Sequence, residues 1–143
     1  MKILLRIFKV GLAIGCIILL LYACGFGRNP ISTWQVEKIE LTGWNKDGTS
    51  TVELNENDVR KFIMRLNLSK TVGQVAAERC ERTFSICVHM KDGRRIYIMD
   101  HDDERMKVTG FSDQSIWIAN SLLLETIKNL VHDYGLVWQS WGC

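Results

Sequence analysis

The sequence is poor in the motifs that most directly indicate an activity. It has one proline, Pro30, and it contains neither a Gly-x-Ser-x-Gly elbow nor a His-Glu-x-x-His metal motif. The sequence therefore lacks the signatures of two common classes of enzyme, the serine hydrolases and the zinc proteases. His89, His101 and His132 have Asp and Ser residues near them in sequence, but adjacency alone does not make a catalytic group. We therefore expect no catalytic residue and no cofactor.

Basic charge is scarce once the N-terminus is set aside. The 143 residues include 18 Lys and Arg and 16 Asp and Glu, a net charge of +2. Lys2, Arg6 and Lys9 precede Val10, so 15 basic and 16 acidic residues remain, a net charge of −1. No acidic residue lies before Glu37. A nucleic-acid-binding domain needs a basic surface, so we expect no nucleic-acid partner.

An uncharged apolar run extends from Val10 to Phe26. Basic residues before such a run place the N-terminus in the cytoplasm and the following chain outside. As a helix, its 17 residues rise about 25 Å, slightly less than the roughly 30 Å hydrocarbon core of a bilayer. We expect a signal peptide or membrane anchor, a linker and a single extracytoplasmic domain, in residues 1–24, 25–32 and 33–143 respectively.

The end of the run, Leu-Tyr-Ala-Cys, resembles the lipobox of bacterial lipoproteins. Leu21, Ala23 and Cys24 match that pattern, whereas Tyr22 stands where a small residue is usual. The resemblance covers about 24 residues and implies cleavage before Cys24 and lipidation of its thiol. The alternatives are an uncleaved signal anchor and a secreted product, the latter disfavoured because no small-x-small cleavage site is present. Lipoprotein and anchor both place the domain on the outer face of a membrane, in the periplasm or at the cell surface.

Strand patterns dominate the domain. Residues 33–44 are rich in β-formers, but their apolar residues change phase near Glu37 and Lys38, which indicates a β-bulge. Residues 83–100 alternate around a Lys-Asp-Gly corner and predict a hairpin. Further short strands are expected in residues 51–54 and 105–119. Residues 68–82 show no clear period, and we expect a long loop there.

Two segments have helical periodicity. In residues 55–67, Asn55 precedes an apolar stripe, and in residues 120–135 a wider stripe follows Asn120 and ends at Gly135. Both segments follow a strand pattern, which suggests a duplicated unit. We therefore predict an α+β fold, an antiparallel sheet of about five to seven short strands with two helices packed on one face.

One acidic cluster could bind a hard cation such as Ca²⁺. Its carboxylates are Asp100, Asp102, Asp103 and Glu104. An EF-hand loop would need glycine and a carboxylate where Arg105 and Phe111 stand, so that motif is excluded. The simpler interpretation, which we favour, is a solvated loop.

Three cysteines of the domain, Cys80, Cys87 and Cys143, are disulfide candidates in an oxidising compartment. A bond from Cys143 to either of the others is geometrically freer than a bond between Cys80 and Cys87, because an extended strand would hold Cys87 away. Zinc binding by Cys80, Cys87 and His89 fits no known finger spacing.

Tryptophan is abundant, with five residues. Trp138 and Trp141 in the C-terminal tail would form a partner-binding surface if exposed. The sequence therefore predicts a tethered, non-enzymatic binding module of inhibitor or immunity type, whose partners are the membrane, through the N-terminus, and another protein. The alternatives are a small metal-dependent hydrolase that uses the acidic cluster and a structural component of an envelope complex.

Overall fold

The computed structural model describes five parts of the chain, which are residues 9–17, 30–73, 84–100, 104–111 and 113–138. Residues 9–17 are helical, with Val10, Leu12, Ile14 and Ile17 exposed. Within the described ranges, no helix has the length and apolar character needed to cross a bilayer.

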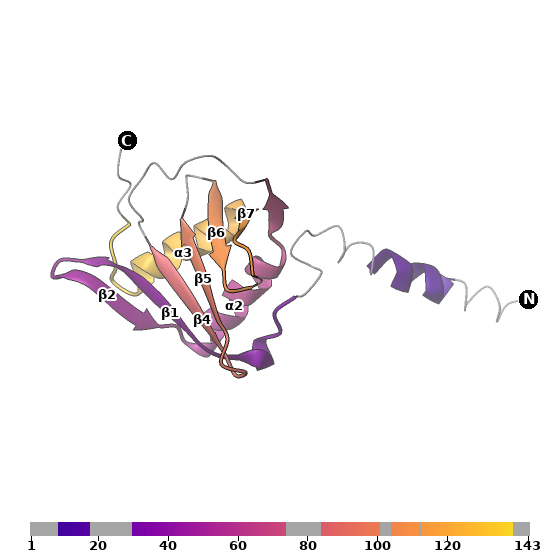
Figure 1. Cartoon of the computed structure of the whole chain (residues 1–143), viewed down its shortest axis with the longest axis horizontal. Helices are drawn as coiled ribbons and strands as arrows, with labels where there is room; N and C mark the ends of the chain where they lie inside the picture. Colours follow the sequence, from indigo (N-terminus) through magenta and orange to yellow (C-terminus); the bar gives the residue numbers. More distant parts are fainter. Residues whose placement is uncertain (1–8, 18–29, 74–83, 101–103, 112, 139–143) are drawn as a thin grey trace, which may run out of the picture.

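A seven-stranded sheet with the spatial order β2-β1-β4-β5-β6-β7-β3 forms the centre of the domain (Figure 1). Every neighbouring pair of strands is antiparallel. In chain order the strands are β1 Val36–Asn45, β2 Gly48–Glu53, β3 Lys70–Val72, β4 Ser85–Met90, β5 Arg95–Asp100, β6 Arg105–Thr109 and β7 Ile116–Ala119. This sheet confirms the predicted α+β class.

Local sequence signals explain the shape of the central strands. The pairing of β1 with β4 shifts between Val36 and Lys38, so the bulge lies where the apolar phase changes. The β4–β5 hairpin turns at Gly93, whose φ of +87° is a conformation that glycine adopts without steric cost.

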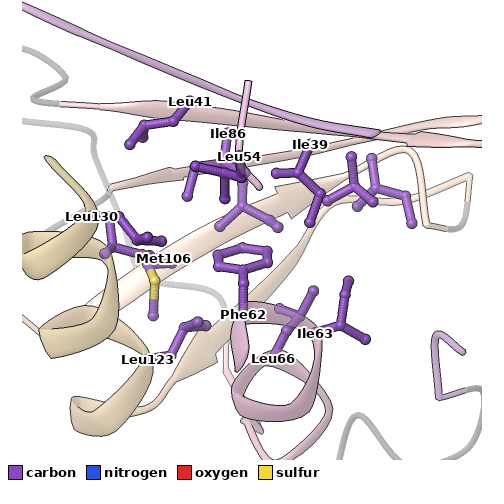
Figure 2. Close-up of a cluster of buried hydrophobic side chains, with 14 of the residues drawn as sticks. Ile39, Leu41, Leu54, Phe62, Ile63, Leu66, Ile86, Met106, Leu123 and Leu130 are labelled. Atoms are coloured by element: carbon purple, nitrogen blue, oxygen red, sulfur yellow. The ribbon is translucent and has the colours of Figure 1, made fainter. Parts of the chain in front are cut away.

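Two helices cover one face of the sheet, α2 (Glu56–Asn67) and α3 (Ser121–Asp133). Figure 2 shows Phe62 of α2 between the two layers, pointing toward the strands. Its side chain is fully buried, which favours folding by about 1.5–3 kcal/mol relative to an exposed ring. The buried apolar residues of the described chain run from Ile31 to Leu136, so the core draws on nothing from residues 9–17.

The helices are antiparallel, and each begins beside the end of the other. Asn55 caps α2, and its backbone N–H donates to the hydroxyl of Tyr134 at the C-terminus of α3 (2.9 Å). Asn120 caps α3, and its Nδ2 donates to the carbonyl of Arg65 in the last turn of α2 (2.8 Å). These reciprocal caps satisfy end groups that a single helix leaves without partners.

The arrangement agrees with a duplicated unit. Each helix follows a hairpin, β1–β2 before α2 and β6–β7 before α3, and the two hairpins flank β4–β5 symmetrically. The remaining strand, β3, extends one edge. Because β2 and β3 lie at opposite edges, α2 carries the chain across the whole sheet.

Two segments differ from expectation. Part of the expected loop at residues 68–82 is the edge strand β3, which its pairing with β7 stabilises and which is too short to show a period. Trp34, expected to begin a strand, lies instead on a 3₁₀ turn, η1 (Thr33–Gln35). Ile31 is buried, so the core begins before the expected boundary at residue 33.

Candidate functional site

The candidate site is the face of the sheet opposite α2 and α3, which no described helix covers; we call it the open face. Strand alternation places polar and aromatic side chains there, and the strand register sets them in rows. One row is Glu40, Cys87, Tyr97 and Thr109. The next is Thr42, Ser85, Met99, Lys107 and Trp117.

An ion-paired group occupies the β1–β4 part of the open face. Glu40 on β1 accepts a hydrogen bond from Lys38 Nζ through one carboxylate oxygen. Its other oxygen lies 2.8 Å from His89 Nε2 on β4. The bulge at Glu37 produces this arrangement, because it brings Lys38 opposite His89 in the register.

The same contacts set the charges of the group. The hydrogen bond from Lys38, and then that from His89, lower the pKa of Glu40 below its usual 4.5. The pKa of Lys38 rises above 10.5 because Glu40 accepts its hydrogen bond. Glu40 is therefore ionised at neutral pH, and a carboxylate that is held ionised in this way is a poor general acid.

Cys87 lies next to this group but does not complete a nucleophile–base pair. Partial burial raises the pKa of the Cys87 thiol, which a hydrogen bond with Tyr97 partly opposes. Only a thiolate is an effective nucleophile, so a raised pKa disfavours covalent catalysis. Among the described residues, no hydrogen bond joins Cys87 to His89, whose Nε2 is engaged by Glu40.

The second row ends in an aromatic contact. Lys107 Nζ on β6 lies 5.8 Å from the ring centroid of Trp117 on β7, within the range of a cation–π interaction. Met99 is the direct neighbour of Lys107 on β5. Further along the face, the Tyr97 side chain remains 38% exposed. The open face therefore presents aromatic, sulfur-containing and charged groups on a rigid set of strands.

The predicted metal ligands fall only partly within the described chain. Asp100 ends β5 and Glu104 precedes β6, whereas Asp102 and Asp103 lie outside the described residues. Asp100 Oδ1 lies 3.4 Å from the backbone N–H of Phe84. The described ranges contain no group of three or more potential ligands that could hold a metal ion.

The other predicted site residues are also divided. Cys24, Cys80, Cys143 and Trp141 lie outside the described residues, so lipidation and disulfide pairing remain predictions. The Cys87 thiol is free in the described structure. Trp138 is half-buried, its ring 5.3 Å from that of Phe84 and 5.3 Å from Lys128 Nζ. Packing against the core occupies part of the Trp138 surface that a partner would use.

The sequence interpretation missed Trp34, which is 71% exposed. The missed signal was Ser32-Thr-Trp-Gln35, a Ser-x-x-Gln capping box. In the structure the Gln35 side chain accepts from the Ser32 backbone N–H (3.2 Å), which completes this box. A capped turn, and not a strand, was the correct interpretation of that pattern.

Comparisons with protein-family models, with curated proteins and with solved structures give no match.

Proposed function

We propose that this chain is a membrane-tethered, extracytoplasmic binding module without catalytic activity, which engages another protein through its open face. The observation that carries the proposal is the open face itself. It is built on hydrogen-bonded strands and carries Tyr97, Met99, Arg95 and Trp117. Tyrosine, methionine, arginine and tryptophan are the residue types enriched in the buried centres of protein interfaces.

The chemistry of the face supports binding in preference to catalysis. The carboxylate of Glu40 is committed to Lys38 and His89, and the Cys87 thiol has a raised pKa. These interactions hold side chains in place before a partner arrives, which reduces the entropy lost on association. The tether follows from the basic and apolar N-terminus, either as an acylated Cys24 or as an uncleaved anchor.

Position-specific photo-crosslinking tests the proposal. A benzoylphenylalanine replaces Tyr97 on the open face or, as the control, Met64, which is exposed on α2. The full chain is expressed in its own host and irradiated. We expect one discrete adduct from position 97 and none from position 64.

A charge reversal tests whether the open face is the surface that binds the crosslinked partner. Lys107→Glu on the open face should abolish the position-97 adduct, whereas Lys61→Glu on exposed α2 should leave it unchanged. An adduct of equal yield from positions 97 and 64, or no adduct from position 97, would contradict the use of the open face.

A further inference from the structure

We infer that Trp34 is a lipid contact, an aromatic side chain that the domain holds in the headgroup region of the bilayer to which the chain is tethered. This inference rests on the proposed tether and specifies which end of the domain faces the membrane. The indole is 71% exposed, although the turn that carries it is held firmly. Tryptophan is enriched at membrane–water interfaces because its ring is apolar and its N–H is polar.

Three sets of hydrogen bonds fix the turn that carries Trp34. Ser32 and Gln35 form its capping box. Both backbone polar groups of Ile31 bond to the Asn67 side chain at the end of α2 (2.9 and 2.8 Å). The Gln35 carbonyl accepts from the Lys91 backbone N–H in the β4–β5 turn (2.9 Å). A large apolar side chain is thus presented to the outside by a rigid support, which is typical of a contact residue.

The short chain before Trp34 keeps it near the bilayer, which favours lipid as its occupant. The apolar run ends at Phe26, eight residues before Trp34. An acylated Cys24 lies ten residues before Trp34. Fully extended, eight to ten residues span at most roughly 29–36 Å. The exposed indole therefore stays within reach of the bilayer surface. The turn that carries it lies beside the β4–β5 turn, because the Gln35 carbonyl accepts from the Lys91 N–H there.

The charges around Trp34 indicate an aromatic contact and not an electrostatic one. Trp34 borders a cavity of ≈570 Å³. Three acidic and three basic residues line it, namely Glu37, Glu53, Glu56, Lys38, Arg60 and Lys91. Because these charges balance, the contact should form on uncharged lipid and should persist at high salt.

This contact orients the whole domain. Trp34 lies on η1, which leads into β1, and Trp44 lies about 26 Å along β1 from its first residue, Val36. With Trp34 at the bilayer, the strands point away from it, and the open face is accessible from the side. A partner tethered to or lying along the same membrane could then reach Tyr97.

Lipid quenching of tryptophan fluorescence tests the inference. The full chain is reconstituted in phosphatidylcholine vesicles with or without bromine on the acyl chains, and flotation confirms that it is bound to them. The quantity compared is the loss of tryptophan emission on brominated relative to unbrominated vesicles. For Trp34→Phe this loss should fall below roughly half of the wild-type loss. Trp44→Phe, at the far end of β1, should leave the quenching unchanged, and salt at roughly three times the physiological ionic strength should have no effect.

The outcomes separate this inference from the proposed tether. Equal quenching of wild type and Trp34→Phe on vesicles that carry the chain overturns the lipid contact and leaves the tether intact. A chain that does not float with the vesicles refutes the tether and the contact together. Because Trp34 is largely exposed, Trp34→Phe should retain the wild-type urea midpoint, which excludes misfolding as the cause of lost quenching.

Discussion

Replacing Asn120 should destabilise the domain more than any other single change at a helix terminus. Its Oδ1 accepts from the Leu123 N–H (3.1 Å), and its Nδ2 donates to the Arg65 carbonyl (2.8 Å) and to Ser69 Oγ (3.1 Å). Ser69 is fully buried, so without Asn120 its oxygen keeps only its own hydrogen bond to the Arg65 carbonyl (3.3 Å) and gains no donor from bulk water.

The magnitude follows from these three contacts. Loss of a helix cap costs about 1 kcal/mol, and each of the two further hydrogen bonds contributes ~0.5–1.5 kcal/mol. Asn120→Ala should therefore lower the free energy of unfolding by about 3 kcal/mol. Asn120→Ser retains a capping oxygen but cannot reach Arg65, so it should lose about 2 kcal/mol. Asn55→Ala, at the exposed cap of α2, should lose only about 1 kcal/mol because water can replace its partners.

Urea unfolding of the fragment 30–143, followed by tryptophan fluorescence, measures these differences. The fragment contains every buried core residue of the described chain and should fold alone. The order of stability should be wild type, then Asn55→Ala, Asn120→Ser and Asn120→Ala. An Asn120→Ala variant within about 0.5 kcal/mol of wild type would refute the reciprocal-cap argument.

Two further predictions concern the sheet. Lys38, and then His89, lower the pKa of Glu40 in the folded state. Above the unfolded pKa near 4.5, the ionised carboxylate therefore stabilises the fold fully. This contribution is lost as the pH falls through the lower folded-state pKa. Glu40→Gln should therefore flatten the dependence of the urea midpoint on pH below about 4.5. Identical acid limbs for Glu40→Gln and wild type would contradict this. Gly110→Ala should cost more than about 2 kcal/mol, because φ is +83° and the added Cβ would overlap the Arg95 carbonyl oxygen. Gly93→Ala, at φ +87° in open space, should cost only about 1 kcal/mol, and equal midpoints for the two glycine variants would be evidence against the clash.

The positions of helices, hairpins and bulges could be predicted wherever the signal, a side-chain period or a cap, lies within a few neighbouring residues. The bulge near Glu37, the β4–β5 hairpin and the caps at Asn55 and Asn120 depend on residues a few positions apart, and each lies where expected. The edge strand β3 could not be predicted, because three residues show no period and only their pairing with β7 makes them a strand. The Ser-x-x-Gln signal before β1 is equally local, and it indicates the capped turn that the structure has there.

The candidate site was less predictable than the fold. From the sequence, His89 is one of three histidines near Asp and Ser residues and a zinc candidate with Cys80 and Cys87, and neither role names Glu40 as its partner. Its partner Glu40 lies 49 positions away, and only the pairing of β1 with β4 brings them together. Likewise, the capping role of Asn120 could be predicted, whereas its hydrogen bond to Arg65, 55 positions away, could not.

The sequence by itself determined the class of fold, the two amphipathic helices and the polarity of the β4 and β5 faces, because periodicity and capping act over a single turn or strand. The tertiary structure alone decided the order of the strands, the grouping of Lys38, Glu40 and His89, and the exposure of Trp34. Those properties depend on which distant segments become neighbours. The free energy that selects the neighbours comes from burial of the whole core, which no short stretch of sequence contains.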